Sequence, residues 1–119
     1  MNQIVYALLF GLCMLVPIKQ KGIASYYSDK FEGRKTASGE IFRQNKFTAA
    51  HRTLPFGTEV RVINDDTGDS VNVIINDRGP FIKGRIIDVS KEAAKRLGFF
   101  KQGLANVTIE ILNIDDEEI

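Results

Sequence analysis

Apolar and polar residues alternate along much of the chain between residues 22 and 112. In three runs, 58–63, 70–76 and 106–112, valine or isoleucine recurs at every second position. Because successive side chains of a strand point to opposite faces, each run predicts a half-buried β-strand. Two shorter runs, 23–27 and 85–89, predict further strands.

The link between the first two runs is Asn-Asp-Asp-Thr-Gly, residues 64–68. These residue types favour tight turns because asparagine and aspartate bond their own backbone and glycine tolerates a positive φ. We therefore expect 58–63 and 70–76 to form a β-hairpin.

One helix is indicated between residues 90 and 98. Ser90 is a favourable N-cap, Glu92 lies in the first turn and Gly98 follows as a terminator. Its apolar face consists of Ala93, Ala94 and Leu97. Several short strands with one helix predict a mostly β fold, and a closed barrel would leave no exposed strand edge. The pattern alone leaves a sandwich open.

The length and the charge bound the classes of function. A chain of 119 residues suffices for one domain with its own core. The formal net charge of +1 gives no electrostatic reason to expect nucleic acid as a partner. Cys13 is the only cysteine, so the body of the chain can form neither a disulfide nor a cysteine metal site.

Residues 1–18 have the character of an export segment. The run 4–16 is nearly all apolar, which fits a signal-peptide core better than the roughly 20 residues of a spanning helix. Lipidation of Cys13 is disfavoured because the bulky Leu12 precedes it. We expect export to the periplasm or cell envelope, with no stable membrane insertion after processing. The alternative is that this segment is a strand or helix of a cytoplasmic protein.

At the other end of the chain, residues 113–119 include four consecutive acidic residues. A run of like charges of this kind is expected to be a solvated tail.

Three polar clusters interrupt the strand pattern. The loop TASGE, residues 36–40, is made of small residues that let a ligand approach the backbone, and it ends in a carboxylate. The segment TAAH, residues 48–51, contains the only histidine. The segment NDRGP, residues 76–80, ends an apolar strand, where a rigid sheet would hold a carboxylate next to a loop. Each cluster alone also fits a structural role: an exposed loop, a buried histidine or a capped turn.

Asp88 is flanked by apolar residues, which predicts a partly buried carboxylate that either anchors a hydrogen-bond network or acts as a second acid. A zinc site would have to combine His51 with Asp and Glu ligands only, which is uncommon. We therefore expect no metal and no cofactor.

The clusters occur within four blocks, GIASYYSDKFEGRKTASGE, FTAAHRTLPFGTEVRV, VNVIINDRGPFIKGRIIDVSKEAAKRLG and VTIEIL. Their order and spacing over residues 22–112 resemble the double-psi β-barrel domain of the rare lipoprotein A (RlpA) family of bacterial septal lytic transglycosylases. Expansins and barwin-like plant proteins share this fold more distantly. The resemblance implies a six-stranded double-psi β-barrel with one or two short helices and a polysaccharide groove across one face.

The resemblance also implies catalytic residues at Glu40, His51, Asp77 and Asp88. Asp77 is the principal candidate: it would protonate the leaving oxygen and then accept a hydroxyl proton. His51 would orient Asp77 or bind the glycan. The candidate substrate-binding residues are Ser38, Thr48, Arg78, Tyr26 and Phe81. Tyr27 is a further aromatic candidate for stacking on a sugar, with core packing as the alternative.

The activity implied is endolytic cleavage of the bond between N-acetylmuramic acid and N-acetylglucosamine in peptidoglycan glycan strands. The C6 hydroxyl of the muramic sugar attacks its own anomeric carbon and leaves a 1,6-anhydro end. We expect a monomer to carry out this reaction. The alternative is a non-catalytic, expansin-like module that binds or loosens the cell wall, because binding and cleavage would use the same groove.

Overall fold

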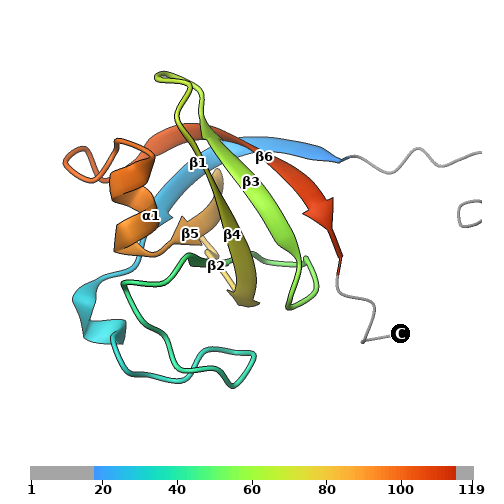
Figure 1. Cartoon of the computed structure of the whole chain (residues 1–119), viewed down its shortest axis with the longest axis vertical. Coiled ribbons are helices and arrows are strands. Elements are labelled where there is room, and N and C mark those ends of the chain that lie inside the picture. Colours follow the sequence, from blue (N-terminus) through green and yellow to red (C-terminus); the bar gives the residue numbers. More distant parts are fainter. Residues whose placement is uncertain (1–17, 115–119) are drawn as a thin grey trace, which may run out of the picture.

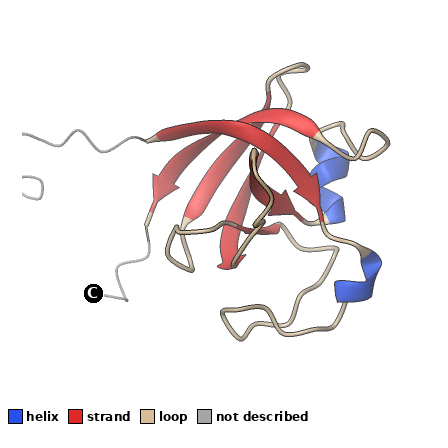
Figure 2. Cartoon of the chain, turned by 180° about the vertical axis from the view of Figure 1, so that it is seen from behind, coloured by secondary structure: helices blue, strands red, loops and turns tan. Residues whose placement is uncertain are grey.

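The computed structural model describes residues 18–114, whose strands close into a six-stranded barrel (Figure 1). The strands are β1 (Lys19–Tyr26), β2 (Thr48–Ala50), β3 (Glu59–Asn64), β4 (Ser70–Asp77), β5 (Arg85–Val89) and β6 (Ala105–Asn113). Two short helices, the 3-10 helix η1 (Asp29–Phe31) and α1 (Lys91–Arg96), lie outside the barrel (Figure 2). The mostly β, double-psi barrel expected from the sequence is confirmed, and the sandwich is excluded.

Around the barrel the strands follow the order β1-β5-β2-β4-β3-β6, and β6 closes on β1. β1 pairs with β5 and β2 pairs with β4 in parallel, whereas the other four pairs are antiparallel. Parallel pairing requires crossover connections, and closure gives every strand two neighbours. Neither helix within residues 18–114 has the length and apolar character needed to cross a lipid bilayer.

The alternation predicted from the sequence fills the barrel interior. One side of each strand contributes fully buried aliphatic residues, and α1 adds its apolar face at one side. This core consists of Ala24, Ala49, Val60, Val62, Val73, Ile75, Ile87, Val89, Ala93, Ala94, Leu97, Val107 and Ile109. Each buried valine, leucine or isoleucine contributes on the order of 1.5–3 kcal/mol relative to an exposed side chain.

The strand predictions are confirmed with small shifts at the ends. β5 has the predicted range, β4 extends one residue further at its end, and β3 and β6 each differ by one residue at both ends. β1 begins at Lys19, four residues before the predicted start. β2 was not predicted because a strand of three residues, two of them alanine, is too short to display a period.

The predicted helix and hairpin are also confirmed. The Ser90 hydroxyl accepts a hydrogen bond from the backbone N–H of Ala93 (3.3 Å), as an N-cap does, and Gly98 has a φ of 78°. In the β3–β4 turn, the Gly68 N–H donates to the carbonyl of Asn64 (2.8 Å). The predicted export segment, apart from Ile18, and residues 115–119 of the acidic tail lie outside the described residues.

A β-bulge in β4 changes the face on which this strand ends. Ile75 pairs with Ala49 and Asp77 pairs with Ala50, so Asn76 is an extra residue opposite β2. A strict period of two would place Asp77 on the same face as Ile75, in the core. The bulge turns Asp77 to the outer face of the barrel instead.

A second bulge lies in β5, where Ile86 is the extra residue opposite β1. Its side chain occupies the space beside Gly22, because a Cβ added at Gly22 would lie 2.5 Å from Cγ2 of Ile86. Gly22 therefore provides the space that this bulge needs.

We expect Gly22→Ala to lower the free energy of unfolding by about 1–3 kcal/mol, the usual effect of overpacking. Without the contact to Ile86, alanine in a strand should instead stabilise by roughly 0.5–1 kcal/mol. Urea unfolding measures the sign directly. Adding Ile86→Ala to Gly22→Ala should recover part of the loss. A Gly22→Ala protein as stable as the wild type, or more stable, would show that the bulge does not need this space.

Candidate active site

Four side chains form one row across four neighbouring strands. Ser25 of β1 pairs with Asp88 of β5, Asp88 pairs with Ala50 of β2, and Ala50 pairs with Asp77 of β4. Directly paired residues point to the same face of a sheet. All four line one open groove with a volume of about 360 Å³. The structure thereby brings together two of the predicted catalytic residues, Asp77 and Asp88.

Ala50 separates the two carboxylates. Its strand lies between those of Asp77 and Asp88, so the Cα atoms of the two aspartates are two strand spacings apart, roughly 10 Å. The side chain of Ala50 is a single methyl group that lines the groove and is 2% exposed.

Asp77 serves as a hydrogen-bond acceptor at both of its oxygens. Oδ1 accepts from the backbone N–H of Ala37 (2.8 Å) and from that of Arg78 (2.9 Å). Oδ2 accepts from the phenol of Tyr27 (2.6 Å). An ionised carboxylate is acceptor-only, and these three donors all suit that form.

Asp88 lies in a different environment. Its Oδ1 accepts a hydrogen bond from the Ser25 hydroxyl, whose oxygen in turn accepts from Nη1 of Arg85 (3.0 Å). Burial raises the pKa of Asp88, and the nearby charge of Asp77 acts in the same direction. The Ser25 hydrogen bond and the Arg85 charge oppose this effect without cancelling it. Asp88 therefore holds its proton to a higher pH than an ordinary aspartate does.

Positive charge also reaches the groove, from Arg78, Arg85 and Lys30. The Arg78 guanidinium donates to the carbonyl of His51 (3.1 Å) and lies 4.1 Å from the ring centre of Phe56. These two contacts hold the Arg78 side chain beside the groove.

Glu40 and Ser38 lie on the loop 36–40, which is attached to the β4 bulge. The Ser38 N–H donates to the carbonyl of Asn76 (3.2 Å), and Oε1 of Glu40 accepts from the Asn76 amide (3.0 Å). These contacts place the N–H of Ala37 on Asp77. In this structure the Glu40 carboxylate binds the bulge residue, and the loop serves Asp77 through its backbone.

The His51 ring is 5% exposed and uses both of its nitrogens. Nδ1 accepts from the backbone N–H groups of Thr53 and Leu54, each at 3.1 Å. Nε2 lies 2.9 Å from Oε1 of Gln20. Because Nδ1 accepts, the proton resides on Nε2, which donates to Gln20, and the ring is neutral.

The charge state of His51 follows from its surroundings. Burial lowers the pKa of His51 to about 4, and the charges of Arg52 and Arg78 add to the effect. The link between His51 and Asp77 runs through the main chain, since the His51 N–H donates to the Asp77 carbonyl (3.1 Å). The sequence assigned His51 to orienting Asp77 or binding the glycan; in the structure its ring bonds to the chain after β2 and to Gln20.

The remaining candidates occupy three places. Tyr26 lines the groove, stacks on Phe100 with ring centres 5.3 Å apart, and donates its hydroxyl to the Phe100 carbonyl (2.9 Å). Thr48 lies on β2, two residues before Ala50 and on the same face. Phe81 is in the loop after β4 with 77% of its surface exposed.

Ser25, Arg85 and the hydroxyl function of Tyr27 were not anticipated. Ser25 and Arg85 lie in predicted strands, and only the pairing of β1 with β5 brings them to Asp88. A hydroxyl or guanidinium within a short strand is the only signal that the sequence offers. Tyr27 was considered for sugar stacking, not as a donor to Asp77.

The family model described as lytic transglycolase matches residues 19–109. The probable endolytic peptidoglycan transglycosylase RlpA of Synechocystis sp. is 57% identical over 91 residues. The endolytic peptidoglycan transglycosylases RlpA of Neisseria meningitidis and Rickettsia bellii are 58% identical over 91 residues and 51% identical over 102 residues. The three alignments cover 76%, 76% and 83% of this chain but 28%, 38% and 45% of the relatives. The chain therefore spans less than half the length of each.

Solved structures share the fold at lower identity. The Streptomyces papain inhibitor superposes with a TM-score of 0.66 at 24% identity, covering 82% of this chain and 99% of the inhibitor. An expansin of Clavibacter michiganensis gives a TM-score of 0.63 at 22% identity, covering 80% of this chain and 50% of the expansin. Both comparisons concern the barrel fold alone.

The buried neutral histidine predicts a pH dependence of stability. The pKa of His51 is lowered in the folded state from its ordinary value of 6.5 to about 4, so between these values the unfolded chain binds the proton first. The contribution of neutral His51 to the free energy of unfolding is fully present above pH 6.5. It is lost as the pH falls toward 4, and the loss is on the order of 2–3 kcal/mol. Urea unfolding at pH 7, 5.5 and 4 measures it.

His51→Asn is the matched variant. The Asn side-chain oxygen can still accept from the N–H groups of Thr53 and Leu54, but it does not titrate. The difference in stability between wild type and variant should therefore shrink as the pH falls from 7 to 4, while carboxylates titrate equally in both. Parallel curves over this range would show that His51 is not held neutral by the fold.

Proposed function

The chain belongs to the lytic transglycolase family, and within it to the RlpA type, and from this premise we propose that it is an endolytic peptidoglycan lytic transglycosylase. It cleaves the bond between N-acetylmuramic acid and N-acetylglucosamine and leaves 1,6-anhydro ends. The observation that carries the proposal is the pair Asp77 and Asp88. The two carboxyl groups share one groove and have different surroundings: three hydrogen-bond donors bind Asp77, whereas burial raises the pKa of Asp88. Paired titratable groups of this kind suit an acid and a base.

The two aspartates divide the proton transfers. Protonated Asp88 donates its proton to the glycosidic oxygen as the bond from this oxygen to the anomeric carbon breaks. The C6 hydroxyl oxygen of the muramic sugar bonds to the anomeric carbon, and its proton passes to Asp77. One proton has then moved from Asp88 to Asp77, and exchange with solvent restores the starting state. The sequence favoured Asp77 for both transfers; the contacts of Asp77 and Asp88 support a division between them.

The nucleophile belongs to the substrate, which explains why no group of the protein needs to activate water. A hydroxyl held in line with the anomeric carbon reaches effective concentrations that exceed those of any solvent molecule. The base needs only to be within reach of that hydroxyl, and Asp77 lines the open groove. The reaction requires no cofactor.

The location follows from the substrate. Peptidoglycan lies outside the cytoplasmic membrane, so the activity requires export, in agreement with the apolar run 4–16. Glu40, His51, Ser38 and Thr48 act by holding the segments around the groove, whereas Arg78, Tyr26 and the exposed Phe81 contact the glycan.

The product tests the reaction class. Purified glycan strands incubated with the protein should yield fragments that are lighter by one water than hydrolysis products, as detected by mass spectrometry. Asp77→Asn and Asp88→Asn should each lower the rate by about 10²–10⁴-fold, the usual contribution of a general acid or base. Asp66→Asn, the same change on the exposed β3–β4 turn, is the control with unchanged activity. Ordinary reducing ends would make the protein a hydrolase, and binding without cleavage would make it a wall-binding module.

A substrate with an activated leaving group separates the two roles. An aryl muramyl glycoside needs little protonation of its leaving oxygen, so Asp88→Asn should cleave it at nearly the wild-type rate. Asp77→Asn should remain slow because the C6 hydroxyl still has to lose its proton. The opposite pattern would exchange the roles of the two aspartates.

A further inference from the structure

Tyr27 occupies a special place in the groove because its phenol contacts one of the two carboxylates. The hydroxyl donates to Oδ2 of Asp77 at 2.6 Å, and the residue, which directly follows β1, lines the same groove as Asp77 and Asp88. The two N–H donors to Asp77 are both on Oδ1. Among these three donors, Tyr27 is the one that binds Oδ2 of Asp77.

Counting acceptor sites shows which atom of Asp77 is left for a substrate. A carboxylate has about four lone-pair sites, two on each oxygen. The N–H groups of Ala37 and Arg78 use both sites on Oδ1, whereas Tyr27 uses one site on Oδ2. The site that remains is on Oδ2. The Tyr27 hydroxyl therefore fixes the direction in which this last acceptor site points.

The Tyr27 ring is itself held firmly. It stacks on Phe42 with ring centres 4.1 Å apart and an interplanar angle of 18°, and Phe42 is 1% exposed. The ring of Phe31 meets it edge-on at 5.7 Å. The Tyr27 N–H donates to the carbonyl of Val89 (3.0 Å), which continues the pairing of β1 with β5. Aromatic pairs of this geometry stabilise beyond the area that they bury.

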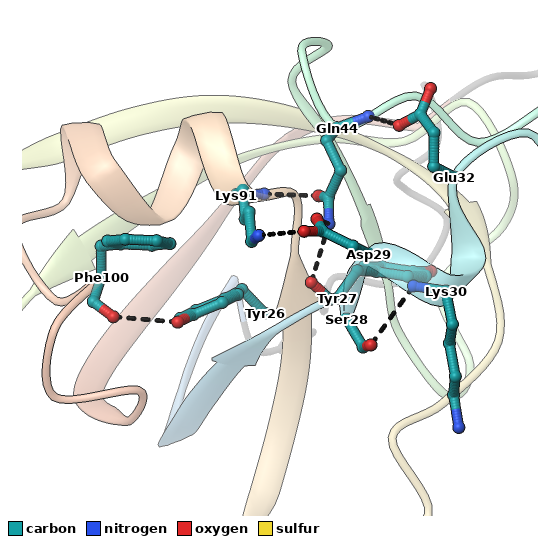
Figure 3. Close-up of polar contacts among 9 residues, drawn as sticks. All are labelled: Tyr26, Tyr27, Ser28, Asp29, Lys30, Glu32, Gln44, Lys91 and Phe100. Carbon is teal, nitrogen blue, oxygen red and sulfur yellow. Dashed lines mark hydrogen bonds and ion pairs between the residues drawn. The ribbon is translucent and has the colours of Figure 1, made fainter.

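Gln44 holds the backbone of Tyr27 from the other side (Figure 3). Its amide nitrogen donates to the Tyr27 carbonyl (2.8 Å) and to Oδ1 of Asp29 (3.2 Å), and its amide oxygen accepts from the N–H of Lys91 (2.8 Å). The Lys91 ammonium also pairs with Oδ2 of Asp29 (2.7 Å). This network ties the segment that carries Tyr27 to the start of α1.

The Tyr27 hydroxyl is a permanent donor. Burial raises the pKa of Tyr27 far above the physiological range, and the hydrogen bond to Asp77 and the charges of Asp77 and Asp88 act in the same direction. The phenol therefore stays protonated and remains a donor to Asp77. Its effect is to orient Asp77.

We propose that Tyr27 is a positioning residue that aims the free acceptor site of Asp77 Oδ2 at the hydroxyl group that loses its proton. This inference rests on the proposed transglycosylase function and adds a residue to it. Without the phenol, both acceptor sites of Oδ2 are open. The carboxylate is then no longer held with one particular site facing the substrate hydroxyl. Substrate binding does not depend on this orientation, but the proton transfer does.

Tyr27→Phe tests the proposal because it removes the hydroxyl and keeps the ring between Phe42 and Phe31. We expect kcat on glycan strands to fall by about 10-fold or more, with KM unchanged. Adding Tyr27→Phe to the inactive Asp77→Asn variant should leave the affinity for glycan unchanged. Thr108→Val is the matched control: it removes a buried hydroxyl that donates to Oδ1 of Asp65 (2.8 Å), away from the groove. It should lower the thermal midpoint comparably and leave kcat unchanged.

A second variant covers the case in which Tyr27→Phe fails to fold. Gln44→Met keeps the length of the side chain but loses the hydrogen bonds to the Tyr27 segment, and it should lower kcat with KM unchanged. Wild-type kcat in Tyr27→Phe, or in Gln44→Met if the first variant does not fold, would overturn the positioning role and leave the transglycosylase proposal intact. If kcat falls equally in Tyr27→Phe and Thr108→Val, the loss follows from lower stability, and Tyr27 has a structural role and not a positioning role. If the wild-type protein gives no cleavage, both proposals are overturned.

Discussion

The extra residue in β4 is the constraint on which the site depends. Asn76 shifts the register between Ile75 and Asp77. The side chain of Asp77, the last residue of β4, therefore points to the opposite face of the sheet from that of Ile75. Without that shift, Asp77 would be a carboxylate in an aliphatic core, at a large cost in desolvation. With it, Asp77 joins Ala50 and Asp88 in one outward row. The same residue anchors the loop 36–40, so one bulge both exposes the carboxylate and supplies a donor to it.

Barrel closure makes this arrangement rigid. Asp77 and Asp88 lie on strands that both pair with β2, and each of those strands is paired again on its far side. Their separation is therefore fixed by strand spacing and does not depend on the conformation of a loop. Their surroundings differ: backbone and phenol donors from outside the row bind Asp77, whereas Asp88 is buried beside Ser25 within the row, and this burial raises the pKa of Asp88.

The sequence predicted the regular parts of this structure because they obey a simple period. Alternating valine and isoleucine located β3, β4 and β6 to within one residue, and Ser90 and Gly98 marked the limits of α1. The resemblance of the motifs supplied the barrel and placed Asp77 and Asp88 among the candidates. A bulge has no such period, so the face of Asp77 could be known only from its pairing with Ala50.

The same limit applies to residues whose function depends on contacts far apart in the chain. The lone histidine looked like a partner for Asp77, but the nearest acceptors and donors to its ring belong to Gln20, Thr53 and Leu54. The barrel supplies the two carboxylates, and the irregular segment between β1 and β2 supplies two of the three donors to Asp77. Those donors, the Ala37 N–H and the Tyr27 phenol, are held by point contacts through Asn76 and Gln44. Neither donor belongs to a barrel strand or to the aliphatic core, so the residues that complete the site differ from those that hold the barrel together.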